Sequence, residues 1–423
     1  MSEAHSLRMP WWSSPGGLSA GVLLPLFLLI AYSGSSNMPG LTIRGLRYLT
    51  EDYILMGIGV IALMGITGWM GAQITSPRQS AARPEFAWDR AAMVVGFISL
   101  LAYFIFYRPF LFNPMLLVHT LTGAYRPERA DLGLTTGITS FDNMTPAFFS
   151  LYAYRSIVLG QKSMPIVRLM FWLLLAATAL RVYAWSERLA LIEAGVPIGL
   201  AWIARFSRNW QRWGLLLMAG PLLAMPMLIG YFGIAEYFRS WQSATYNGKM
   251  SFWQFAVGRL ASYYYTSLNN GAGVLSTSNW PNFKFENILY WLHHAPLLGP
   301  IFSNWVHLQS TQLGQFLQKY GDEEFNNPSG IFAVIYDLGL PLGLLYFAFL
   351  SLLAGRAYNA YRSGSMWGVL LYPILFLTFL ENFRVPYLGS SRGFTWFVAI
   401  VIALLIGRTR RRRAPQPLAV AAS

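Results

Sequence analysis

Six arginines near the ends of apolar segments are the residues of this sequence best suited to chemistry on an anion. They are Arg181, Arg188, Arg239, Arg259, Arg384 and Arg392. A guanidinium group donates two parallel hydrogen bonds and stays charged when partly desolvated, which suits a diphosphate. In a transfer from a lipid diphosphate, such groups would stabilise the charge that develops on the leaving group. For each arginine alone, contact with lipid phosphates at the bilayer interface is the alternative.

Proton acceptors occur in the same part of the chain. His294, which follows His293, or an acid of the run Asp322 to Glu324 would accept a proton from an attacking sugar hydroxyl. The acidic run is also compatible with a solvated loop. Neither a His-Glu-x-x-His pattern nor a Cys-containing zinc pattern surrounds the histidines, so the sequence predicts no metal site and no cofactor.

Aromatic and amide side chains supply further substrate-binding candidates. Five aromatic residues are suited to stacking on sugar rings: Trp241, Tyr263, Tyr264, Tyr265 and Trp280. An aromatic belt at the membrane interface explains their presence equally well. Asn327 lies in a turn-like stretch, residues 326–330. No Walker sequence, glycine-rich nucleotide loop or nucleophile elbow is present, which argues against a nucleotide-driven enzyme.

Most of these residues lie in one long polar insert, from Glu236 to Pro328, between two strongly apolar segments. We expect three regions: an N-terminal membrane bundle at 1–235, a long extracytoplasmic loop at 236–327, and C-terminal spans with a basic tail at 328–423. Within the loop, Trp253 to Leu268 is predicted to form an interfacial or re-entrant helix, because apolar residues alternate with single polar ones.

The composition predicts an all-α polytopic membrane protein. Of 423 residues, 55% are hydrophobic and 11% charged, and the mean hydropathy is +0.42. The absence of cysteine excludes disulfides, thiolate metal sites and a thiol nucleophile. About ten apolar runs are long enough to span a bilayer. They are 18–33, 52–71, 91–107, 144–160, 165–183, 187–204, 214–235, 328–354, 365–382 and 393–408.

The basic residues orient this bundle. With the N-terminus in the cytoplasm as an uncleaved anchor, the loops on that side and the C-terminal tail carry 16 basic residues and three acids. They hold most of the formal net charge of +14, so the charge predicts cytoplasmic N- and C-termini and no nucleic acid partner.

Five ionisable residues lie in or at the ends of the apolar runs, where an unpaired charge is costly: Arg155, Arg188, Glu193, Asp337 and Glu381. Glu193 follows Arg188 by five residues and therefore faces another direction on a helix. We expect Glu193 to pair with another helix, through Arg155, and Ser186 to cap the helix that Arg188 begins.

Several segments resemble the Wzy-type polymerases of O-antigen and oligosaccharide repeat units, which are related to the WaaL-type ligases. The stretch 181–193 is similar to their arginine-bearing hairpin, and Arg188 and Gly199 have an Arg, ten residues, Gly spacing. The segments 298–299, 325–330 and 337–343 resemble the end of their long loop and the glycine-rich span that follows. A second Arg, ten residues, Gly pattern is missing from the insert, since the position after Arg259 that should hold glycine is Asn270. Asn326-Asn327 stands where a ligase carries His-Asn, which favours a polymerase.

This resemblance implies a GT-C-like, metal-independent glycosyltransferase of the bacterial inner membrane. It would join polyprenyl-diphosphate-linked oligosaccharides, with Arg188, Arg259 and Arg384 on the diphosphate and Arg239 and Arg392 in reserve. The expected partners are those lipid-linked glycans, the bilayer and a chain-length regulator. The alternatives are an O-antigen ligase and a lipid-linked glycan transporter or flippase.

Overall fold

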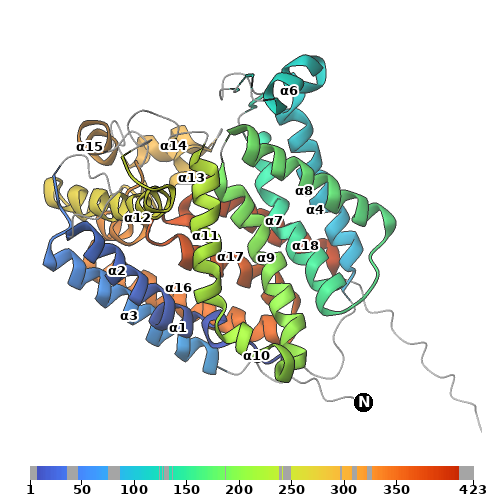
Figure 1. The fold of residues 1–423 in the computed structure, drawn as a ribbon, viewed down its shortest axis with the longest axis horizontal. Helices are drawn as coiled ribbons and strands as arrows, with labels where there is room; N and C mark the ends of the chain where they lie inside the picture. Colours follow the sequence, from blue (N-terminus) through green and yellow to red (C-terminus); the bar gives the residue numbers. More distant parts are fainter. Residues whose placement is uncertain are drawn as a thin grey trace, which may run out of the picture.

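The computed structural model of the chain is helical throughout the residues that it describes (Figure 1). These are residues 7–35, 46–74, 86–122, 124–125, 127, 133–135, 137–185, 187–237, 241, 249–295, 298–306, 312–321 and 326–408. No β-strand occurs in these ranges, and a single isolated bridge joins Phe86 to Arg408. The predicted all-α class is therefore confirmed.

Six helical segments in the described ranges are long and apolar enough to cross a bilayer, which makes this a membrane-embedded protein. Four of them are single helices: α3 (Glu51–Gln73), α4 (Trp88–Phe106), α8 (Pro165–Trp185) and α16 (Gly330–Arg362). The segment Pro15–Gly34 consists of α1 (Pro15–Leu18), η2 (Ser19–Leu23) and α2 (Leu24–Ser35). The segment Leu189–Met218 consists of α9 (Arg188–Phe206), η6 (Ser207–Asn209) and α10 (Trp210–Met218). Three shorter helices are also apolar: α11 (Gly220–Glu236), α17 (Met366–Glu381) and α18 (Ser391–Gly407).

The predicted number of about ten spans stays a prediction, because six segments of the described residues meet both criteria. The run 144–160 consists of two shorter pieces, α7 (Thr145–Ala153) and the π-helical η5 (Tyr154–Val158). The run 214–235 is interrupted at Ala219, where the backbone leaves helical geometry ahead of Pro221. Whether these pieces cross the bilayer remains a prediction.

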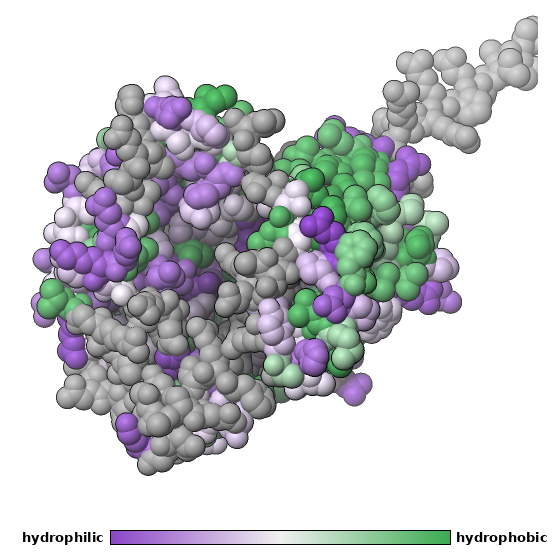
Figure 2. All heavy atoms as spheres, turned by 90° about the horizontal axis from the view of Figure 1, so that it is seen from above, coloured by the Kyte–Doolittle hydropathy of each residue, from purple (hydrophilic) through white to green (hydrophobic). Residues whose placement is uncertain are grey.

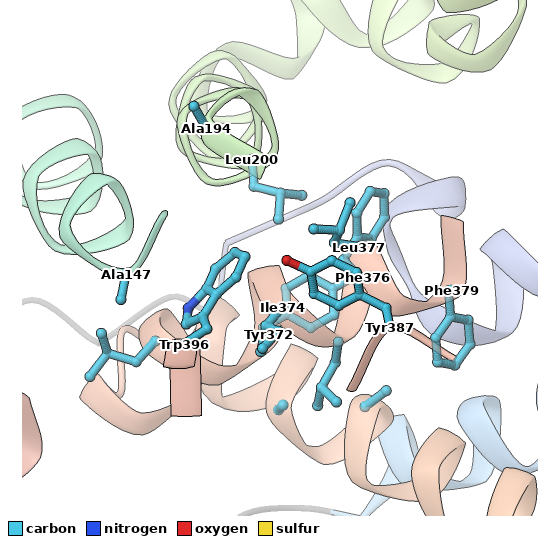
Figure 3. Close-up of a cluster of buried hydrophobic side chains, with 14 of the residues drawn as sticks. Ala147, Ala194, Leu200, Tyr372, Ile374, Phe376, Leu377, Phe379, Tyr387 and Trp396 are labelled. Atoms are coloured by element: carbon cyan, nitrogen blue, oxygen red, sulfur yellow. The ribbon is translucent and has the colours of Figure 1, made fainter. Parts of the chain in front are cut away.

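The helices form two groups that α17 joins. In Figure 1, α1, α2, α3 and α16 lie on one side and α4, α7, α8, α9 and α18 on the other. Helix α17 packs against α16, α7, α9 and α18. Helix α17 is apolar around its whole circumference, as is typical of a helix surrounded by protein or lipid, and most of its residues are buried. Figure 3 shows Leu200 of α9, Trp396 of α18 and Tyr387 gathered beside Tyr372 and Phe376 of α17.

Small residues allow α3 and α16 to pack closely. A Cβ atom at Gly71 would overlap the backbone of Leu352, and one at Gly355 would overlap the backbone of α3 around Gly68. Close backbone approach through small residues is the usual way for helices to associate in membranes, where apolar burial gives no advantage over lipid.

Helix α16 is broken at Gly339. This residue has φ +77° and ψ 168°, a conformation that essentially only glycine adopts. Pro341 has no N–H to give to the carbonyl of Asp337. The N–H groups of Asn282 and Phe283 donate instead to the carbonyls of Tyr336 and Asp337, at 3.1 and 3.0 Å. The break thereby fixes the insert to the membrane bundle.

The described part of the insert forms helices rather than an open loop. They are α12 (Phe252–Thr277), α13 (Tyr290–His293), α14 (Leu298–Trp305) and α15 (Gln312–Tyr320). The helix predicted from Trp253 to Leu268 is confirmed within α12, which begins with a capping box between Ser251 and Gln254. Figure 1 places these four helices together at one end of the molecule.

Candidate functional site

Arg181 and Arg392 belong to one buried ion network. Arg181 of α8 binds Asp142 at 2.6 Å and also Glu187. Arg392, at the start of α18, binds the same Glu187 and reaches Glu193 of α9 at 2.7 Å. The tertiary structure thus brings these two arginines together as predicted from the sequence, but it places three carboxylates between them.

Glu193 has a different partner from the expected one. Its carboxylate binds Arg392 and accepts a hydrogen bond from the Tyr387 hydroxyl at 2.7 Å. Arg155 lies in η5 and pairs with Asp89 at the start of α4, at 2.9 Å. The predicted pairing of Arg155 with Glu193 is therefore wrong, because Glu193 contacts Tyr387 of the last loop, residues 382–390 between α17 and α18, and Arg392 just after it. Spacing along the chain does not contain this information.

The network leaves almost no space for a ligand. The cavity beside Asp142, Arg181 and Glu193 measures about 10 Å³. Burial raises the pKa of the Asp142 carboxyl to about 6, and the neighbouring Arg181 opposes this rise. The arrangement is suited to holding α8, α9 and α18 together at this end of the bundle.

Two further arginines are paired within the described residues. Arg384 binds Glu381, lies over the ring of Tyr263 at 4.8 Å, and has a buried Nε with no hydrogen-bond partner in the described part of the chain. Arg259 of α12 binds Glu236 at the end of α11, at 3.1 Å, with both side chains buried. Arg259 and Tyr263 are one helical turn apart, so both pairs lie along the same face of α12.

Several predicted site residues lie outside the described residues. They are Arg239 and the acidic run Asp322 to Glu324. Ser186, the expected helix cap, is also outside. Arg188 begins α9 with its backbone, but its side chain is not described.

A cavity of about 410 Å³ lies between the insert and the last loop. Its polar lining residues are Glu286, Asn287, Tyr290, His293, His294, Asn326, Asn327 and Ser390. Leu313 and Leu317 of α15 and Val385 and Pro386 of the last loop add apolar surface. Figure 2 looks down on this end of the molecule, where hydrophilic side chains gather on one half and apolar ones on the half that includes α6 (Pro114–Leu121).

Glu286 is the buried acid of this cavity. Its Oε1 accepts a hydrogen bond from Asn282 at 3.1 Å, and its Oε2 is buried with no hydrogen-bond partner in the ranges described. Burial, and then the Asp337 carboxylate, raise the pKa of Glu286 to about 7. A carboxyl group with a pKa near neutrality in a cavity is suited to general acid or base chemistry.

The loop before Glu286 is strained. Phe283 and Phe285 have φ of +51° and +55°, in the left-handed region that costs an ordinary residue about 1 to 2 kcal/mol. Asp337 holds this loop in place: its carboxylate accepts from the N–H groups of Asn287 and Ile288, both at 2.9 Å, and from the Asn287 amide at 3.0 Å. Asp337 therefore positions the loop that carries Glu286.

The two histidines differ in what they can do. The ring of His293 contacts the Lys284 carbonyl at 2.9 Å and the Ser303 hydroxyl at 3.1 Å, and burial lowers its pKa. His293 is thus a structural residue. His294 is exposed, stacks on Tyr290 and donates from Nδ1 to the Tyr290 carbonyl at 2.9 Å. This tautomer leaves Nε2 as a proton acceptor.

The predicted sugar-stacking aromatics are not in the cavity lining. Trp241 packs on Phe252 and Phe255, and Tyr264 packs edge-on against Phe383. Trp280 donates its indole N–H to the Leu275 carbonyl. Asn327 does line the cavity, and its carbonyl accepts from Asn270 at 3.2 Å.

Glu286 and Asn287 carry no signal in the sequence, since they lie in an ordinary polar stretch. Only the positive φ values and the break in α16 bring them to the cavity. Among the residues that the structure describes, no three His, Asp or Glu side chains are grouped to hold a metal ion. Comparison with protein-family models, curated proteins and solved structures finds no match to this chain.

Proposed function

We propose that this protein is a membrane glycosyltransferase that joins polyprenyl-diphosphate-linked oligosaccharide repeat units into a surface polysaccharide such as O-antigen. One observation carries the proposal: the cavity of about 410 Å³ combines a buried carboxyl group of raised pKa with His294 and several amides. Amides and an acid suit the hydroxyl-rich surface of a glycan.

In the proposed reaction, Glu286 is the general base. Its carboxylate takes the proton of the acceptor sugar hydroxyl while that oxygen bonds to the anomeric carbon of the donor. The bond from that carbon to the diphosphate breaks, and the polyprenyl diphosphate leaves with the electron pair. His294, which lines the same cavity, is the alternative base.

Arg384 is the described arginine best suited to the leaving diphosphate. It directly precedes Val385 and Pro386, which line the cavity, and its buried Nε still has a hydrogen bond to give within the described structure. Arg181 and Arg392 are assigned a structural role, because their three carboxylate partners would repel a second anion. Arg259, which is buried in its pair with Glu236, is likewise assigned a structural role. Arg188 and Arg239 remain diphosphate ligands in this proposal.

A lipid-linked glycan transporter is the second candidate, and the broken helix α16 favours it. Discontinuous helices commonly form substrate sites in transporters. In α16, however, the carbonyls exposed by the break are occupied by the N–H groups of Asn282 and Phe283. This occupation supports the enzyme.

The test is to incubate the purified protein in detergent with defined lipid-linked repeats, without a membrane or gradient. The enzyme is expected to produce a ladder of lengthened glycans on the lipid carrier. Transfer of single glycans to another acceptor would identify a ligase. No new glycosidic bond, together with movement of lipid-linked glycan in proteoliposomes, would support the transporter and overturn the proposal.

A further inference from the structure

A second polar cavity lies at the opposite end of the bundle, where α4 begins and α18 ends. The bridge between Phe86 and Arg408 and the stacking of Trp88 on Tyr154 define this end. The cavity measures about 280 Å³ and lies at the turn between η5 and α8. It is independent of the proposed reaction.

The lining of this cavity is suited to an anion. Lys162 and Arg168 supply two exposed cations, Gln161 supplies a neutral donor, and no acid is among the described lining residues. The nearby Asp89 is neutralised by Arg155, at 2.9 Å. An anion entering the cavity therefore meets a net positive field.

One further observation indicates a built site. Ser163 lines the cavity and is 8% exposed, yet its Oγ has no hydrogen-bond partner among the described residues. A buried hydroxyl without a partner is costly, and an anion in the cavity would accept its hydrogen bond. The turn leads directly into α8, so the cavity lies at the end of a membrane-spanning helix.

We infer that this cavity binds the phosphate group of an anionic phospholipid. The lipid is favoured over a soluble phosphate because apolar side chains continue from the cavity along the exposed face of α8. These are Ile166, Leu169, Trp172 and Leu173, which are 42%, 53%, 60% and 47% exposed. A headgroup in the cavity places its acyl chains along this face.

Native mass spectrometry of the detergent-purified protein tests the site, with phosphatidylglycerol and phosphatidylcholine as probes. We expect retention of phosphatidylglycerol over phosphatidylcholine, and a fall in retention of about fivefold for each charge lost in K162A and R168A. Ser163→Ala is expected to lower retention about tenfold, by removing a hydrogen bond to a charged group. The matched control is R205A/R208A, which removes two exposed charges from the junction of α9 and η6.

Thermal unfolding of the protein in the presence of glycerol phosphate distinguishes a lipid headgroup from a soluble phosphate as the ligand. Stabilisation of the wild type but not of S163A, without retention of phosphatidylglycerol, would overturn the lipid and assign a soluble phosphate. The site would be overturned if S163A, K162A/R168A and the control all lost phosphatidylglycerol retention equally, or if none of them lost it.

Discussion

The loop between α17 and α18, residues 382–390, separates two regions of opposite character. On one side lies the ion network, in which Arg181 and Arg392 pair with three carboxylates and share one of them, Glu187, around a space of about 10 Å³. On the other side Val385, Pro386 and Ser390 line a cavity of about 410 Å³. The arginines that the sequence singles out are thus neutralised by carboxylates, whereas the open cavity is lined by acid and amide groups that belong to no sequence motif.

This contrast has a physical cause. A charge inside a membrane protein must be paired, so a conspicuous arginine in an apolar run is expected to have a carboxylate nearby. Space for a ligand exists only where packing is incomplete. Here the cavity lies between α13, α15 and the last loop, beside the strained loop at Phe283 and Phe285.

The largest expected effect concerns the cavity. Glu286→Gln removes the proposed base and keeps the shape of the side chain, so the rate of glycan joining should fall roughly a hundredfold to ten-thousandfold. The assay is the detergent reaction with lipid-linked repeats. Glu51→Gln, at an exposed acid of α3, is the control and should have no effect. An unchanged rate in Glu286→Gln would remove Glu286 from the reaction.

A substitution in the ion network should instead lower the free energy of unfolding. Arg392→Ala leaves the buried Glu193 without its cation, while Glu187 keeps its pair with Arg181, and this should cost about 3 to 5 kcal/mol. Thermal unfolding in detergent measures this, and adding Glu193→Gln should restore part of the loss.

Arg108→Ala, at an exposed arginine, is the matched control and should change stability by less than about 0.5 kcal/mol. If Arg392→Ala abolished activity at an unchanged melting temperature, Arg392 would be a substrate ligand and the contrast between the two regions would disappear.

A smaller effect is expected where the insert is fixed to α16. Asn287→Ala removes the amide donor at 3.0 Å from the buried Asp337 carboxylate, which should cost about 1 to 3 kcal/mol. Asn326→Ala, at an exposed position of the same cavity, is the comparison and should leave the melting temperature unchanged. Equal melting temperatures for both variants would show that Asp337 does not depend on this donor.

The smallest effect is the pH dependence of the reaction. Because the pKa of Glu286 is raised to about 7 and the base acts as a carboxylate, activity should increase with pH through this value. At pH 6 about a tenth of the groups are ionised, so the rate should be about a tenth of its plateau above pH 8. The rate of glycan joining, measured from pH 5 to pH 9, tests this. A rate that falls over the same interval would indicate a general acid.

Part of the site was predictable. The sequence located the insert and supplied His294 and Asn327, which line the cavity, and Arg384, which directly precedes Val385 of the lining. Two other candidates, Arg181 and Arg392, lie in the ion network instead. Sequence reasoning misassigned the partner of Glu193 and gave no indication of Glu286. Pairing across helices depends on which helices are neighbours, and residues 193 and 392 are almost two hundred positions apart.

The sequence by itself determined the membrane class, the helical fold and the position of the polar insert, because hydropathy and helix length are local properties of the chain. Tertiary structure alone decided which arginines are neutralised and where a cavity remains. Those outcomes depend on contacts between distant segments, such as the insert loop docked in the break of α16 at Gly339. A residue type indicates what chemistry a side chain can perform, but its neighbours in the tertiary structure decide whether that side chain is open to a ligand or already paired within the fold.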